Sequence, residues 1–363
     1  MAGRIAKLVA GNLLVLLVII WSLNLLSSIA LDGEHVVEQW FVPPSDKADS
    51  PSLSDRQAAR TIFHEFSLLR TRYVPYLAWS REPFEGEYTH VDETGDRVHT
   101  PTTDRPRGRV HFFGGSTIWG KGVGDEETIP ALFNRLHPDH AVYNHGESGF
   151  VSRQSLARLV NLRNQDTEMD LVVFYDGCND VYTLCRSDVS INGHSREHQI
   201  ARKLRPSSHT LQSLVGPLRE VIVFLRTSLG SRRHGPSACQ EDPAYAQRVA
   251  ETMVNNWRIA RTLALDAGAD FHAILQPLAP IGRPSVDYLR DTALVSSRSV
   301  DYSTVYPLVQ EIILRESAPW LHDFTDSFDV DEYIYIDDCH VNARGNEIIA
   351  RRVDDVAGAA LAP

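Results

Sequence analysis

The sequence lacks several patterns by which enzymes and binding proteins are often identified. Its 363 residues contain no Walker-type or dinucleotide-binding glycine pattern, no internal repeat, and no cysteine–histidine spacing typical of a zinc site. The chain has 36 Lys and Arg but 47 Asp and Glu, which gives a net charge of −11. Basic residues are therefore too few to form a phosphate-binding face. We therefore expect no cofactor, no metal and no nucleic-acid partner.

Charged side chains are missing from one long N-terminal segment, Leu8 to Leu31. Its length suffices to cross a bilayer core of ~30 Å. Arg4 and Lys7 precede it and acidic residues follow it, so the positive-inside rule predicts a cytoplasmic N-terminus and an exported remainder. The alternative is a signal peptide cleaved near Ala30, where small residues stand. The length of the apolar run favours an uncleaved, single-pass anchor in the cell membrane, and both interpretations place the bulk of the chain outside the cytoplasm.

Cysteine is scarce, with residues at 178, 185, 239 and 339 only. An exported chain can form disulfides, and more than one pairing is possible. A bond between Cys185 and Cys239 would close off the long segment between them, and one between Cys178 and Cys339 would join two segments that we place at the functional site below. Free buried thiols are the alternative, and the sequence leaves the pairing open.

We divide the chain into an anchor with its cytoplasmic tip (1–31), a linker and N-terminal extension (32–108) and a main domain (109–363). Prolines and serines between Phe41 and Asp55 indicate a linker. The segment 57–73 has helical spacing and is expected to pack on the main domain, and 88–99 resembles a hairpin around a Gly-containing turn.

In the main domain, β-rich runs alternate with segments of helical spacing. The expected strands are 110–115, 141–144, 171–175, 271–275 and 321–325. The expected helices are 129–136, 152–164, 245–267, 304–316 and 342–360. Such alternation predicts an α/β fold with a central parallel sheet between two layers of helices.

A segment at about 184–242 breaks this alternation and reads as an insertion. It is either a lid or substrate wall, or a solvated surface excursion. Its one amphipathic stretch, 211–229, makes a lipid an alternative substrate. Its histidines lack the tight spacing of a metal site; they are His194, His198, His209 and His234.

Four segments with polar residues follow expected strands or precede the last helix: 114–117 (Gly-Gly-Ser-Thr), 144–149, 176–180 and 337–340. Gly-Gly-Ser by itself is also an ordinary loop. Because the carboxyl ends of parallel strands gather in one crevice, these segments can meet although they are far apart in sequence.

These segments, in this order, resemble the four motif blocks of the SGNH (GDSL) hydrolase family. The similar blocks are Gly-Gly-Ser-Thr, a glycine in the second segment, Gly-x-Asn-Asp in the third and a late Asp-x-x-His. The resemblance covers roughly 109–360 without the insertion, and 113–133 is similar to membrane-anchored bacterial members. It implies a flavodoxin-like three-layer α/β/α sandwich, here with an N-terminal transmembrane helix.

The residue types suit nucleophilic catalysis. A serine hydroxyl needs a base within hydrogen-bond reach, and Ser116 with His340 meets that need. The other ring nitrogen of His340 needs an acceptor, for which Asp337 matches the Asp-x-x-His of the family and Asp338 is the competing acid. The non-catalytic alternative for His340 is a histidine on the surface or at the cap of a helix.

The resemblance implies an oxyanion hole made of the Ser116 and Gly149 backbone N–H groups and the Asn179 side-chain amide. Gly149 is preferred over Gly146 because the family glycine follows the small residue at the loop tip. The alternatives are a plain turn glycine and an Asx-turn asparagine. Asp180 is expected to brace its loop.

Two further candidates stay open. His145 lies near the site but is more simply a structural histidine. Trp119 is either a stacking wall for a sugar ring or a packed aromatic.

The resemblance and the anchor together predict a membrane-anchored, extracytoplasmic serine esterase that cleaves an O-acyl ester, in particular an O-acetyl ester, on a small molecule or cell-envelope glycan. Alternatives are an acyltransferase with the same triad, a lipase-like esterase, and a non-catalytic glycan-binding module.

Overall fold

The computed structural model describes residues 3–4, 10–12, 15–27, 46–204, 237–289 and 293–361. The chain forms two compact units, one of residues 1–43 with 199–235 and the other of 44–198 with 236–363.

In the first unit, the helix Ala10–Ser27 is long and apolar enough to cross a membrane, with a mean hydropathy of 2.0. An anchor and a signal sequence both have this character. The cleavage site considered near Ala30 and the amphipathic stretch 211–229 lie outside the described residues.

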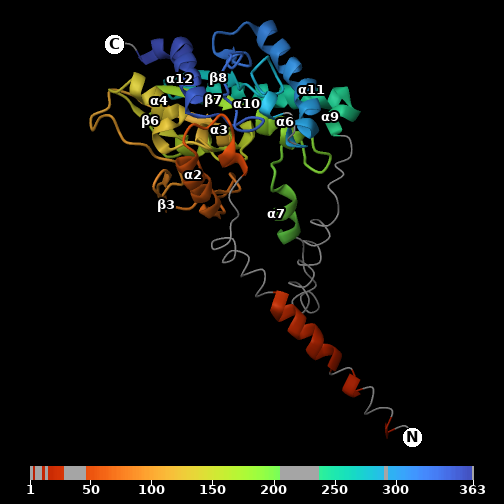
Figure 1. Ribbon diagram of the computed structural model, residues 1–363. Coiled ribbons are helices and arrows are strands. Elements are labelled where there is room, and N and C mark those ends of the chain that lie inside the picture. The colour runs from red at the N-terminus through yellow and green to blue at the C-terminus, as the bar shows by residue number, and fades with distance from the viewer. Residues whose placement is uncertain are drawn as a thin grey trace. The chain divides into compact units, whose positions relative to one another are not determined.

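A five-stranded parallel sheet forms the centre of the second unit (Figure 1). In spatial order the strands are β6 (Ala141–Asn144), β5 (Arg109–Gly114), β7 (Leu171–Asp176), β8 (Asp270–Leu275) and β9 (Leu321–Asp323). Counted along the chain this is the order 2-1-3-4-5, the flavodoxin-like arrangement, so the predicted fold class is confirmed. The topological switch point of this order lies between β5 and β7, where such sheets place their ligands.

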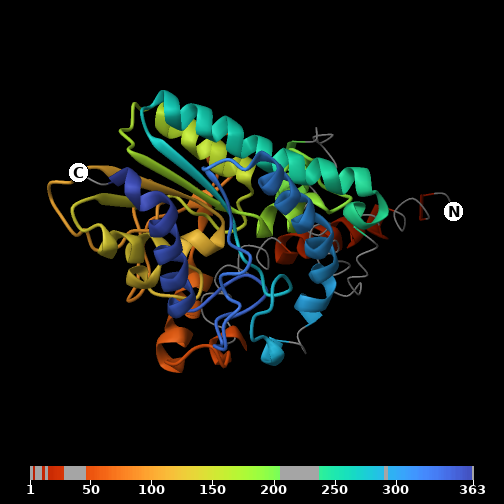
Figure 2. The same ribbon diagram turned by 90° about the horizontal axis from the view of Figure 1, so that it is seen from above.

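Helices cover both faces of the sheet (Figure 2). On one face Phe113 and Phe174 share a core with α5 (Ser152–Arg163), α10 (Pro243–Asp266) and α11 (Ala293–Glu316). On the other, Phe112 and Val173 share a core with α4 (Ile129–Leu136) and α12 (Ala343–Ala357). Successive strand residues point to opposite faces, so both cores draw on the same strands.

From residue 44 on, the linker and N-terminal extension belong to the same unit as the sheet. Their elements are η1 (Asp46–Asp49), α2 (Arg56–Leu68), the antiparallel pair β1 (Thr71–Arg72) with β2 (Ser80–Arg81), and the antiparallel pair β3 (Phe84–Glu85) with β4 (His90–Val91). Phe63 of α2 packs on Ile336, and Leu69 packs on Trp119. The extension therefore touches segments on either side of the sheet edge that carries the predicted site.

Two expected helices have different bounds. The helix expected over 57–73 ends at Leu68, because Leu69 is extended and Thr71 pairs with Arg81. The helix expected from Thr304 begins at Ala293 and continues through Pro307. Packing outweighs weak local propensity here, since Tyr302 lies in the core before the expected start.

The remaining described elements are α3 (Ser116–Trp119), η2 (Asp125–Glu127), α6 (Cys178–Leu184), α7 (Glu197–Leu204), α9 (Ala238–Glu241), η3 (Asp287–Leu289) and η4 (Gly358–Leu361). Cys185, which follows α6, and Cys239 of α9 form a disulfide that brackets the insertion. Cys178 and Cys339 are buried free thiols. Of the two pairings considered from the sequence, only the first is present.

Candidate active site

Ser116 lies at the sharp turn where β5 passes into the short helix α3. Gly115 is the cap of this helix, and Ser116 is its first residue. A Cβ on residue 115 would collide with the side-chain amide nitrogen of Asn179, so glycine at this position lets that amide lie close to the serine. The turn places the Ser116 side chain at the carboxyl end of β5, beside the switch point of the sheet.

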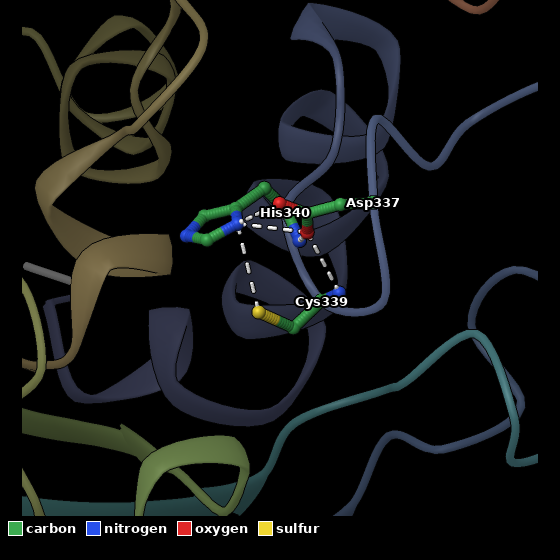
Figure 3. Close-up of side chains that lie close together, drawn as sticks. All are labelled: Asp337, Cys339 and His340. Carbon is green, nitrogen blue, oxygen red and sulfur yellow. Dashed lines mark hydrogen bonds and ion pairs between the residues drawn. The ribbon is translucent and has the colours of Figure 1, made fainter. Parts of the chain in front are cut away.

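The serine, the late histidine and its preferred acid form a hydrogen-bonded chain. Ser116 Oγ lies 2.7 Å from His340 Nε2. His340 Nδ1 lies 2.8 Å from both carboxylate oxygens of Asp337 (Figure 3). All three residues are buried. The structure thus brings together the three residues predicted as a triad, with the ring nitrogens of His340 divided between hydroxyl and carboxylate as nucleophile activation requires.

A local turn orients Asp337. Its Oδ1 accepts hydrogen bonds from the backbone N–H groups of Cys339, at 3.1 Å, and His340, at 2.9 Å. The neighbouring acid has a different environment, because Asp338 Oδ2 lies 3.5 Å from the hydroxyl of Tyr302 on α11. The spacing of three residues therefore puts Asp337, and not Asp338, against the imidazole.

Lys47 makes an ion pair with Asp337 that the sequence did not predict. Burial opposes ionisation of Asp337, but attraction to His340 and Lys47 outweighs it and holds the pKa of this carboxyl well below its usual range. Burial also opposes the charge of Lys47, and the field of Asp337 prevails and raises its pKa. A lysine in a polar linker carries no sequence signal of this role.

The three donors proposed for an oxyanion hole lie on separate segments around Ser116. Within the described residues, the backbone N–H groups of Ser116 and Gly149 donate to no acceptor. Gly149 has φ +82°, a conformation that favours glycine. One amide hydrogen of Asn179 goes to the Phe150 carbonyl at 2.9 Å, which leaves the second for a ligand. Gly146 packs against the backbone of Trp119 instead.

Aromatic and polar side chains border Gly149. A Cβ on residue 149 would lie 3.6 Å from the Trp79 ring and 3.7 Å from Ser195 Oγ. The rings of Trp79 and His194 are 5.4 Å apart, and the Arg196 guanidinium lies 4.5 Å from the Trp79 ring centroid. The described beginning of the insertion therefore lies beside Gly149. Sequence reasoning did not single out Trp79, which stands in the extension without a motif.

The open candidates near the site have structural partners. Trp119 is 1% exposed and packs between Phe66 and Arg97, so it is a packed aromatic and not a stacking wall. His145 is buried, with Nε2 2.9 Å from His111 Nδ1 and Nδ1 2.8 Å from Asp96 Oδ2.

Asp180 braces its loop, as predicted. Its carboxylate accepts the backbone N–H of Ser152 at 3.0 Å and the Ser152 hydroxyl at 2.5 Å. These bonds join the start of α6 to the start of α5.

Asp337, Cys339 and His340 also lie close enough together to hold a metal ion. Their chemistry does not suit one. A hydrogen bond with Cys178, together with burial, raises the pKa of the Cys339 thiol well above its usual range, so this sulfur stays protonated. The Lys47 ammonium already lies against Asp337 and repels a cation. Hydrogen bonding within a triad accounts for the cluster better.

The insertion histidines do not gather into a candidate metal group within the described residues. His194 contacts Trp79, and His198 lies 3.6 Å from Asp188. His209 and His234 lie outside the described part of the chain.

Comparison with known proteins finds no matching family model and no matching curated protein. Solved structures do match. A member of the lipolytic G-D-S-L family from Veillonella parvula has 12% identity and a TM-score of 0.38, over 69% of this chain and 98% of its own. The carbohydrate acetylesterase Est24 from Sinorhizobium meliloti has 14% identity and a TM-score of 0.39, over 70% of this chain and 99% of its own. A variant of the Geobacillus acetyl-xylooligosaccharide esterase Axe2 has 15% identity and a TM-score of 0.35, over 69% of this chain and 95% of its own. Because these values are low, the fold assignment rests on the strand order and the functional assignment on the geometry around Ser116.

Proposed function

We propose that this protein is a serine ester hydrolase of the SGNH type, held at the cell membrane by its N-terminal helix with the catalytic unit outside the cytoplasm. One observation carries the catalytic part: Ser116 Oγ lies 2.7 Å from His340 Nε2, while His340 Nδ1 lies 2.8 Å from Asp337. The arrangement supplies a nucleophile, a base and an orienting acid. The anchor is supported by the apolar helix Ala10–Ser27, and its orientation by Arg4 and Lys7 before the apolar run and the acidic residues after it.

The reaction proceeds through an acyl-serine. Ser116 Oγ attacks the ester carbonyl carbon, and its proton passes to His340 Nε2. The carbonyl oxygen becomes an oxyanion that the Ser116 and Gly149 N–H groups and the Asn179 amide stabilise. The carbon–oxygen bond to the alcohol then breaks, and His340 returns the proton to the departing alcohol. A water molecule, deprotonated by His340, then attacks the acyl carbon. The bond from this carbon to Ser116 Oγ breaks, His340 returns the proton to Ser116 Oγ, and the acid leaves.

The proposed substrate is an O-acyl, in particular an O-acetyl, ester on an extracytoplasmic glycan. The wall beside Gly149 supports this choice, because the half-buried His194, Ser195 and Arg196, which lie around the buried Trp79, offer polar groups of the kind that orient a ligand.

The test is hydrolysis of an aryl acetate by the purified full-length protein. We expect Ser116→Ala to lower kcat/KM by about 10³-fold or more, because the nucleophile is lost. Ser67→Ala, which removes an exposed hydroxyl on α2, is the matched control and should retain activity. A fluorophosphonate should add to Ser116 as detected by peptide mass. Equal activity of Ser116→Ala and the wild type would refute the proposal.

Hydrolysis and acyl transfer share the acyl-serine and differ only in the acceptor. The same assay with and without an added glycan separates them. We expect free acetate as the main product in both conditions. Acetylated glycan forming faster than acetate would replace the hydrolase by the acyltransferase.

A further inference from the structure

The turn that carries Gly149 keeps one backbone N–H group without an acceptor. The carbonyl of Glu147 accepts the N–H of Phe150 at 3.1 Å. Because φ is positive at Gly149 (+82°) but not at Ser148, the turn is of type II. The N–H of Glu147 donates to the Gly114 carbonyl, and that of Ser148 donates to Glu147 Oε1. Among the described residues, the N–H of Gly149 alone finds no acceptor in this turn.

A tryptophan of the N-terminal extension fixes the plane of the peptide between Ser148 and Gly149. Trp79 is buried, and its Nε1 donates to the Ser148 carbonyl at 3.2 Å. This peptide bond is trans, so its N–H points away from its carbonyl and hence away from the indole. A type I turn would reverse the peptide and present the Ser148 oxygen in place of the Gly149 N–H. The hydrogen bond from Trp79 therefore selects the N–H for the side opposite the indole.

The turn lies against the segment that carries the nucleophile. The Phe150 carbonyl accepts a hydrogen bond from Asn179 Nδ2 at 2.9 Å, and a Cβ on Gly115 would lie 3.5 Å from the same oxygen. Gly115 directly precedes Ser116. The Gly149 N–H is thus one residue away from a group that contacts both Asn179 and the turn of Ser116, as a donor to the oxyanion must be.

Contacts from the extension hold both the indole and the turn. Trp79 packs edge-on against Phe150, with ring centroids 5.4 Å apart. Arg81 Nε lies 3.1 Å from Glu147 Oε1, and both side chains are buried. Ala78, which directly precedes Trp79, has φ +73°, a conformation that costs free energy for a residue with a Cβ. Such strain persists only where surrounding contacts impose it, so the fold itself sets the position of Trp79.

We propose that Trp79 is a positioning residue for the oxyanion hole, because its indole N–H holds the peptide between Ser148 and Gly149 with the Gly149 N–H directed at the oxyanion. This inference rests on the proposed hydrolase function and adds to it a residue outside the triad. Trp79 acts only through the Gly149 N–H. Its loss weakens the stabilisation of the oxyanion and leaves proton transfer to His340 unchanged.

The experiment compares para-nitrophenyl acetate with para-nitrophenyl thionoacetate, in which sulfur replaces the carbonyl oxygen. Sulfur accepts hydrogen bonds weakly, so the ratio of the kcat/KM values for the two esters measures what the oxyanion hole contributes. Damage to the triad lowers both values together and cancels from the ratio. For the wild type we expect the oxygen ester to react at least about 10²-fold faster.

Trp79→Phe keeps an aromatic ring and removes the N–H. It should lower this ratio by about tenfold, the effect of one hydrogen bond on the orientation of the peptide, with KM for the oxygen ester within about twofold of the wild type. The analogue 3-benzothienylalanine at position 79 should have the same effect. It preserves the size of the ring and replaces the N–H by sulfur, so it makes the same test if Trp79→Phe does not fold.

Trp320→Phe is the matched control, because this tryptophan precedes β9 at the amino end of the sheet and packs on Phe271. Its ratio should equal that of the wild type. A wild-type ratio in the Trp79 variants, or an equal fall in Trp320→Phe, would overturn the inference. If the wild type hydrolyses the oxygen ester through Ser116 and the Trp79 variants keep its ratio, only this inference fails. If the wild type does not hydrolyse the oxygen ester, the proposed function fails as well.

Discussion

Asp337 and Asp338 stand next to each other in the sequence, yet the fold gives their carboxylates different partners. Asp337 holds His340 Nδ1, and Asp338 faces Tyr302. An asparagine at 337 would not stabilise the imidazolium and would favour the wrong tautomer.

We therefore predict that Asp337→Asn lowers kcat by about 10³- to 10⁴-fold on an aryl acetate. Asp338→Asn is the control and should retain kcat within about threefold, since a substitution outside the triad has a small effect. The measurement is steady-state kinetics on both variants. A larger loss in Asp338→Asn than in Asp337→Asn would make Asp338 the orienting acid.

Asp180 is a second residue whose environment predicts a measurable effect. Burial raises the pKa of Asp180 to about 6, against the hydrogen bonds from Ser152 that lower it. The unfolded value is about 4, so the native state binds the proton more tightly than the unfolded state between these two pH values. The stability gained from this protonation is complete below pH ~4 and is lost as pH rises through ~6.

The prediction concerns the difference in the free energy of unfolding between the wild type and Asp180→Asn, measured by urea denaturation. The free energy of unfolding of the wild type minus that of Asp180→Asn should decrease by about 2–3 kcal/mol from pH 4 to pH 7. Asp266→Asn, at an exposed position on α10, should show no such trend. A difference that is constant with pH, or that favours the wild type as pH rises, would show that Asp180 does not titrate in this range.

At the scale of elements, one buried arginine holds the segment that follows the nucleophile helix. Arg97 Nε lies 2.6 Å from Asp125 Oδ1. Its remaining N–H groups donate to the backbone carbonyls of Tyr88, Trp119, Gly120 and Val123. The extension thereby ties α3 to η2 through a single side chain.

Arg97→Met should lower the free energy of unfolding by about 3–5 kcal/mol, because it leaves Asp125 buried without its main counter-ion and several carbonyls without donors. The exposed Arg105→Met should change it by less than about 0.5 kcal/mol. Chemical denaturation of both variants provides the measurement. A loss of under about 1 kcal/mol for Arg97→Met would show that the segment holds its shape without the arginine.

At the scale of the whole molecule, the proposed location and the disulfide are linked. Cys185 and Cys239 are bonded while Cys178 and Cys339 are free. Disulfides persist in oxidising compartments and are rare in the cytosol. The state of the cysteines therefore reports whether the second unit has been exported.

We predict that the full-length protein, denatured without reductant, exposes two thiols to an alkylating reagent. A variant without residues 10–27 should remain in the cytosol and expose all four. Mass spectrometry of the alkylated proteins counts the thiols, and reduction of both samples to four thiols is the control. Four thiols in the full-length protein would contradict export. The intact mass also separates an anchor from a signal cleaved near Ala30.

Local patterns in the sequence determined the elements of the sheet and their placement. Apolar runs and helical spacing predicted the five strands and the helices between them, because these periodicities follow from backbone geometry. Right-handed parallel connections bring the strand ends to one edge, so the sequence alone predicts that Ser116 and His340 lie near each other. The apolar segment before residue 32 was equally evident, since length and hydropathy are properties of a single run.

Contacts between distant segments were decided only by the tertiary structure. Lys47 reaches Asp337 across 290 positions, and Trp79 meets the insertion beside Gly149, without any pattern in the sequence around them. The choice among the cysteine pairings also required three dimensions, because spacing along the chain does not measure distance in space.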